Sequence, residues 1–160
     1  MKKNLFVLLT LLFSSYTSFS QSLKSPEQFL GYQLGDKYTP HYKIVNYFQQ
    51  AAQAMPAMMK LEQYGTTNEG RPLLVAFVAL EENFTKLEEI RKNNLRLTGI
   101  LNDKPGDVNA PTIVWLSYNV HGNETSSSEV AMKTLYELLN PNNTYNEVNS
   151  SSYIYAVIGN

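Results

Sequence analysis

The residues best suited to do chemistry are a histidine and a glutamate separated by two residues, His121 and Glu124. A neutral imidazole and a carboxylate are both ligands that Zn²⁺ takes in hydrolytic sites. On a strand, residues three apart face opposite sides of the sheet, whereas a bent loop turns both side chains toward one point. Gly122 favours such a bend, because glycine adopts backbone conformations closed to other residues. The pair is therefore a candidate metal site; the alternative is a solvated histidine beside a glutamate at a helix N-terminus.

The segments on either side of the pair predict a strand, a tight loop and a helix. Residues 112–118 form an apolar run rich in Ile, Val, Trp and Tyr, which is typical of a buried strand. Such a run predicts an interior strand of a sheet covered on both faces, with Trp115 buried. Ser126 and Glu129 fit a capping box at the start of the following helix. Open α/β sheets place their sites at strand-to-helix connections of this kind.

Further helices are predicted before and after a central hairpin. Thr39 is a suitable N-cap, with Pro40 in the first helical turn. A second helix is expected over residues 81–97, where the mixed charges indicate a solvated face. A strand over residues 152–158 is expected to pair with the same sheet as residues 112–118. The stripe of the first helix, spaced to face a core, consists of Ile44, Tyr47, Phe48, Ala51 and Met55.

The hairpin is predicted from two apolar segments, residues 60–65 and 73–80, joined by a longer turn. Arg71 lies in that turn. It is expected to tie down the loop through hydrogen bonds to carbonyl groups, and the alternative is contact with a substrate carboxylate. The alternation of helices and strands predicts an α/β fold, with a mixed sheet that carries helices on both faces.

Two motifs resemble the M14 metallocarboxypeptidases, the carboxypeptidase A-like family. That family carries H-x-x-E after a central strand, as at His121 and Glu124 here. Residues 64–73, Y-G-T-T-N-E-G-R-P-L, resemble its G-x-S-x-E-G-R-P-L segment. The resemblance spans roughly residues 38–160. It implies an incomplete zinc-carboxypeptidase-like fold, Zn²⁺ held by His121 and Glu124, and peptide or protein C-termini as substrates.

The same resemblance implies that the rest of the machinery lies beyond Asn160. This concerns the third zinc ligand, the general-base glutamate and the arginines that hold a substrate C-terminal carboxylate, so no catalytic residue is assigned here. His41, the other histidine, is expected at the surface and not as the third ligand. Pancreatic-type members often have arginine directly before the ligand glutamate, where this chain has Asn123, and this difference leaves the specificity open.

Residues 1–20 are expected to be a signal peptide. Lys2 and Lys3 precede an apolar stretch, residues 5–13, that is too short to span a membrane. The mature chain, residues 21–160, is therefore expected to be periplasmic or secreted, without a membrane span. The absence of cysteine excludes disulfides within the chain. The net charge of −1 gives no indication of nucleic-acid binding.

The chain is expected to be the N-terminal part of a catalytic domain, because it stops just after a segment that reads as an interior strand. The leading hypothesis is that the full-length protein is a zinc metallocarboxypeptidase. The 160-residue chain alone is expected to be inactive. One alternative is a zinc deacylase of N-acyl amino acids, of the aspartoacylase or succinylglutamate desuccinylase type, in which H-G-N-E is frequent. Another is a non-catalytic truncated module. The G-R-P-L segment and the long stretch before the H-x-x-E motif favour the peptidase.

Overall fold

The computed structural model describes residues 22–119, 121, 124–143 and, for the backbone, 153–159. The expected signal peptide and Asn123 lie outside the described residues. Among the helices described, none is long and apolar enough to span a membrane.

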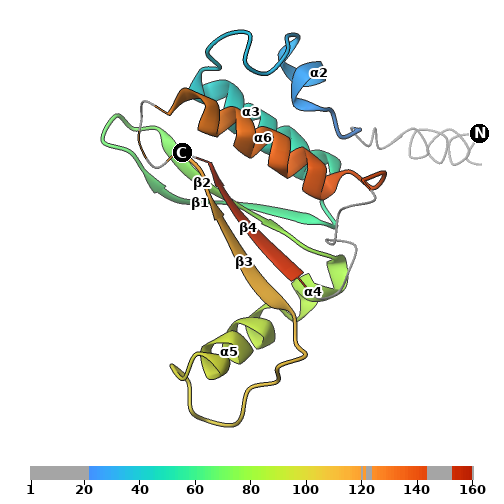
Figure 1. Ribbon diagram of the computed structural model, residues 1–160, viewed down its shortest axis with the longest axis vertical. Helices are drawn as coiled ribbons and strands as arrows, with labels where there is room; N and C mark the ends of the chain where they lie inside the picture. Colours follow the sequence, from blue (N-terminus) through green and yellow to red (C-terminus); the bar gives the residue numbers. More distant parts are fainter. Residues whose placement is uncertain (1–21, 120, 122–123, 144–152, 160) are drawn as a thin grey trace, which may run out of the picture.

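A mixed four-stranded sheet lies at the centre of the molecule (Figure 1). Its strands are β1 (Met59–Thr66), β2 (Pro72–Val78), β3 (Thr112–Ser117) and β4 (Tyr153–Gly159), in the spatial order β1-β2-β4-β3. β1 and β2 form an antiparallel hairpin. β4 pairs antiparallel with β2 and parallel with β3. The predicted hairpin and the pairing of the last strand with the same sheet are both confirmed.

The main core lies between this sheet and a layer of helices on one face (Figure 1). That layer contains α3 (His41–Ala54) and α6 (Thr125–Leu139), and α2 (Pro26–Leu30) packs against both of these helices (Figure 1). Met132 and Leu135 of α6 pack in one buried cluster with Ala76 and Val78 of β2. The predicted stripe of α3 is buried from Ile44 to Ala51, whereas Met55 lies just past the end of the helix.

The predicted helix over residues 81–97 is interrupted. It consists of α4 (Glu81–Thr85) and α5 (Leu87–Leu97), which meet at Lys86 with φ −111° and ψ 10°. Both helices lie near the end of the sheet where β3 begins (Figure 1). The Lys60 ammonium lies 4.8 Å from the centre of the Phe84 ring, which places α4 against the face of β1 opposite the buried Met59. Helices therefore lie on both faces of the sheet, as predicted, but the second layer covers only part of its face.

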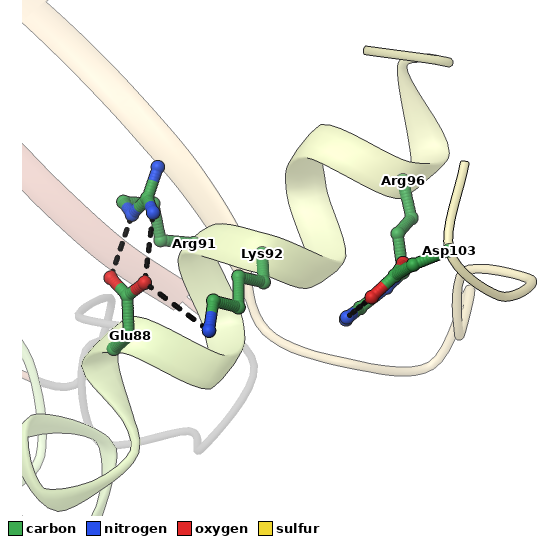
Figure 2. A network of polar contacts seen from close by, with 5 residues as sticks. All are labelled: Glu88, Arg91, Lys92, Arg96 and Asp103. Carbon is green, nitrogen blue, oxygen red and sulfur yellow. Dashed lines mark hydrogen bonds and ion pairs between the residues drawn. The ribbon is translucent and has the colours of Figure 1, made fainter. Parts of the chain in front are cut away.

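The charged side chains of α5 from Glu88 to Lys92 are solvated, as predicted, whereas that of Arg96 is only 7% exposed; ion pairs form at both places (Figure 2). Glu88 accepts a hydrogen bond from Arg91 at 2.7 Å and pairs with Lys92 at 3.7 Å. One helical turn later, Arg96 binds both carboxylate oxygens of Asp103 at 2.6 and 2.7 Å. The second pair links the last turn of α5 to the loop that leads toward β3.

The prediction that Trp115 is buried is wrong, since 65% of this residue is exposed. β3 lies at one edge of the sheet formed by the described strands, and is not interior within it. Leu116 points toward the core under α3 and α6, so Trp115 points to the opposite face. The α4–α5 layer does not extend over Trp115. The apolar run correctly indicated a strand, but only one of its faces is buried in the described residues.

Both predicted helix caps are also wrong. The N-cap of α3 is Pro40, without a side-chain hydrogen bond, and that of α6 is Glu124, not Ser126. Thr39 and Glu129 bind each other: the Thr39 hydroxyl donates to Glu129 Oε1 at 2.5 Å. Gly35 N–H donates to Glu129 Oε2 at 2.8 Å. A buried tertiary contact therefore takes the place of two local caps.

Candidate functional site

A sharp turn at the end of β3 sends the chain into the loop that carries His121. Asn119 has φ 59°, a left-handed conformation that asparagine tolerates better than most residues. Its N–H donates to the Ser127 hydroxyl at 2.6 Å, which links the end of the strand to the first turns of α6. The Tyr118 hydroxyl donates to Thr134 at 2.9 Å and adds a second link. The start of the loop is thus held on α6 by two hydrogen bonds.

The two candidate ligands lie in contact within this loop. His121 Nδ1 and Glu124 Oε1 are 2.7 Å apart. Glu124 N–H also donates to the His121 carbonyl at 3.0 Å, which closes the turn between them. Both side chains are exposed to solvent. The predicted geometry, two side chains turned to the same side at the C-terminal end of a strand, is confirmed.

The Glu124 carboxyl is held in the form that binds metals. The hydrogen bond from the His121 side chain, followed by that from the His121 backbone, holds the pKa of Glu124 below its usual value. A metal takes a carboxylate only when the group has lost its proton. At neutral pH this side chain therefore meets the requirement.

A cavity of about 280 Å³ opens beside the pair. Its wall includes the residue that follows Glu124 and the strand-end Asn119. Another wall comes from the turn of the β1–β2 hairpin, and a third from the start of α3. The lining residues are Tyr38, Thr39 and His41, then Thr67, Arg71 and Leu73, and lastly Asn119, Thr125 and Ser128.

Comparison with protein families matches residues 44–157 to zinc carboxypeptidases, peptidase family M14. The match covers well over half of the chain and includes both the hairpin turn and the His121–Glu124 loop. The chain belongs to the zinc carboxypeptidase family. The resemblance drawn from the two motifs is thereby confirmed.

Solved structures show the same fold. Carboxypeptidase A from Helicoverpa armigera matches 96% of this chain with a TM-score of 0.54 and 15% sequence identity. The chain spans 30% of the length of that carboxypeptidase. A search of curated proteins gives no significant match.

The arrangement of the pair suits a zinc ion. Zinc lies about 2.0–2.1 Å from a histidine nitrogen and about 2.0–2.2 Å from a carboxylate oxygen, so two tetrahedral ligand atoms lie roughly 3.3 Å apart. His121 Nδ1 and Glu124 Oε1 need to separate by only a few tenths of an ångström from their 2.7 Å contact to reach that spacing. His121 Nδ1 and the Glu124 carboxylate would hold the ion.

No third ligand joins the pair within the part of the chain that the structure describes, where no cluster of three or more histidine, cysteine or acidic side chains suits a metal. His41 is half-buried in the wall of the 280 Å³ cavity, so it is less exposed than predicted. Burial, and then the positive charge of Arg71, lower the pKa of His41. His41 is therefore neutral near pH 7.

A larger cavity, of about 630 Å³, does not belong to this site. It lies between α5 and the loop before β3, at the end of that strand opposite the His121 loop. Two of its polar side chains already have partners: Asn93 binds the Asp107 backbone, and Arg96 binds Asp103 (Figure 2). In open α/β sheets the carboxyl ends of parallel strands carry the site, and this cavity lies at the other end.

Glu129 is a structural residue of the site that the sequence pattern did not reveal. Tyr32, Thr39 and Glu129 form a hydrogen-bonded chain, with 2.8 Å between the two hydroxyl oxygens and 2.5 Å from Thr39 to the carboxylate. This chain fixes the segment before α3 against α6. Since Thr39 lines the smaller cavity, Glu129 sets the position of one of its walls.

Proposed function

We propose that this chain is the N-terminal part of a zinc-dependent metallocarboxypeptidase that removes C-terminal residues from peptides. The observation that carries the proposal is the convergence of His121 Nδ1 and Glu124 Oε1, 2.7 Å apart at the C-terminal end of β3, in a member of the zinc carboxypeptidase family. The signal-like start of the chain supports an exported enzyme.

The described residues have defined roles in this proposal. His121 and Glu124 hold the metal, and the turn bond between them fixes their spacing. Asn119 and Ser127 fix the loop on α6. When bound, zinc supplies Lewis-acid activation of a carbonyl group and of a water molecule. A third ligand and a general base come from the remainder of the protein, since this chain spans 30% of a carboxypeptidase A.

The test is the release of a C-terminal residue from a blocked dipeptide by the full-length product of the reading frame. We expect turnover that a chelator abolishes and added zinc restores. Changes in residues that merely support a metal ligand cost about 10–100-fold in affinity or activity, so His121→Ala and Glu124→Ala should each lower kcat/KM by at least about 100-fold. The 160-residue chain, tested in parallel, should show no turnover.

Other results would favour the alternatives. Turnover that survives complete removal of metal would contradict the proposal. Hydrolysis of N-acyl amino acids without peptide hydrolysis would indicate a deacylase. A full-length protein that hydrolyses neither substrate would indicate a non-catalytic role.

A further inference from the structure

The 280 Å³ cavity shares its walls with the proposed metal loop. Thr125 directly follows Glu124, and Asn119 precedes His121 by two residues, so the cavity lies next to the proposed metal loop. Small-molecule pockets usually enclose roughly 300–1,000 Å³. The volume here lies just below that range, which suits one side chain of a substrate and not a whole peptide.

The lining of the cavity combines apolar surface with hydroxyl groups and one permanent cation. Arg71 carries a permanent charge, and hydroxyl groups from residues such as Tyr38, Thr67 and Ser128 supply hydrogen bonds around it. None of the described lining residues is acidic. The carboxylate of Glu129 lies behind the Thr39 wall and already accepts two hydrogen bonds there. An anionic group therefore finds a cation and several donors in this cavity, and the carboxylate that competes for the cation is that of Glu69, which does not line the cavity.

The Arg71 side chain is not needed to close the hairpin turn. Backbone bonds do this: Thr67 N–H donates to the Arg71 carbonyl at 2.8 Å, and Arg71 N–H donates to the Thr67 hydroxyl at 3.1 Å. The guanidinium instead pairs with the Glu69 carboxylate of the same turn at 2.5 Å. The expectation that this side chain ties down the loop through carbonyl groups is not supported.

The partner of Arg71 can be exchanged at little cost. The Arg71 and Glu69 side chains are 53% and 70% exposed, and exposed pairs of this kind contribute little to stability. A substrate carboxylate in the cavity can replace Glu69 on the guanidinium, whose planar fork binds such groups through two parallel hydrogen bonds. Glu69 then acts as an internal competitor for the substrate.

We propose that this cavity is a specificity subsite in which Arg71 binds the side-chain carboxylate of an aspartate or glutamate in the peptide substrate. The inference rests on the proposed peptidase function, and it adds a preference for acidic peptides. Arg71 contacts the substrate away from the bond that is cut.

The test uses the full-length protein and blocked tripeptides that carry glutamate or glutamine at one of the two positions before a constant C-terminal phenylalanine. Binding to the metal-depleted protein is measured by calorimetry, and KM is measured separately on the zinc-loaded enzyme. We expect a preference for glutamate of roughly tenfold at one position, because charge-assisted hydrogen bonds discriminate by about this factor. Arg71→Ala should abolish the preference, and Arg71→Lys should retain part of it.

Glu69→Gln is the matched variant with the opposite expected result. Because it removes the competing carboxylate and keeps the size of the side chain, it should tighten binding of the glutamate peptide several-fold and leave the glutamine peptide unchanged. A general disturbance of the hairpin turn would weaken binding of both peptides. Opposite shifts in the Arg71→Ala and Glu69→Gln variants therefore indicate direct recognition.

The outcomes separate the subsite from the peptidase function. The subsite proposal is contradicted if the protein shows no preference for the glutamate peptide. It is also contradicted if this preference survives in Arg71→Ala. A second comparison uses the same tripeptides as C-terminal amides. If Arg71→Ala no longer distinguishes the free C-terminal carboxylate from the amide, Arg71 binds the chain terminus. The assignment of Arg71 to a side-chain carboxylate is then wrong. Arg71-dependent binding of glutamate peptides without any hydrolysis would support the subsite and contradict the peptidase function.

Discussion

At the scale of single residues, the spacing of His121 and Glu124 was sufficient to predict that their side chains meet. The prediction depended only on local chain geometry, since residues three apart in a tight turn face the same side. Glu129 shows where local reasoning fails. Its position three residues after Ser126 matches a capping box, yet its partners are Gly35 and Thr39, more than eighty positions away in the sequence. No local pattern encodes such a contact.

The two interpretations of Glu129 predict different mutational effects. Glutamine serves in a capping box as well as glutamate does, so Glu129→Gln would be nearly neutral on that interpretation. In the structure both Glu129 carboxylate oxygens accept hydrogen bonds, from Gly35 N–H and from the Thr39 hydroxyl. The amide nitrogen of a glutamine would face one of these donors with a donor of its own. We expect Glu129→Gln to lower the free energy of unfolding by about 1–3 kcal/mol, measured by urea denaturation of the full-length protein.

Ser126→Ala is the matched control for that measurement. Loss of a true N-cap serine costs about 1 kcal/mol. Ser126 is exposed and is not the N-cap of α6, so its replacement should change the free energy of unfolding by less than about 0.5 kcal/mol. A neutral Glu129→Gln together with a destabilising Ser126→Ala would contradict the structure and restore the capping box.

At the scale of secondary-structure elements, the sequence predicted the hairpin, both long helices and the final strand, because their apolar periodicity is regular. The break between α4 and α5 was not predicted. The apolar pattern continues across it, but the Thr85 hydroxyl binds the Glu82 carbonyl at 2.7 Å, and such side-chain bonds compete with helix continuation. The helix then restarts at Leu87.

The link between α5 and the following loop should depend on pH. The hydrogen bond from Arg96 is the main cause that lowers the pKa of Asp103 from 3.8 to about 2. Because the pKa is lower in the folded state, the pair stabilises the fold above about pH 4, and this contribution is lost as the pH falls toward 2. We expect Asp103→Asn to lower the urea midpoint much more at pH 7 than at pH 2, where the folded-state carboxyl is about half protonated. An equal difference at both pH values would show that the pair makes no such contribution.

At the scale of the whole molecule, the alternation of helices and strands predicted a mixed sheet with helices on both faces. The unequal thickness of the two layers was not predicted. An apolar run such as residues 112–118 looks the same whether one face or both are covered, and the position of Trp115 depends on how far the α4–α5 layer extends. Coverage of a face is a property of the assembled layers, and no single segment encodes it.

The site is likewise assembled from distant parts of the chain. The hairpin turn, the start of α3 and the loop after β3 come together at one cavity, which explains why Arg71 and His41 were not placed beside the metal loop from the sequence. The family match spans all of these segments except the start of α3. The central claim, that His121 and Glu124 hold zinc there, concerns binding and is best tested without reference to turnover.

The most direct measurement is the zinc content of the full-length protein after dialysis against a limiting concentration of zinc. The account predicts one zinc ion per chain, lost in His121→Gln and in Glu124→Gln through at least about a 100-fold fall in affinity. His41→Gln is the matched control, since it replaces the other histidine of this chain, and it should keep its zinc. Retention of zinc by both the His121→Gln and Glu124→Gln proteins, or its loss from His41→Gln alone, would contradict the assignment.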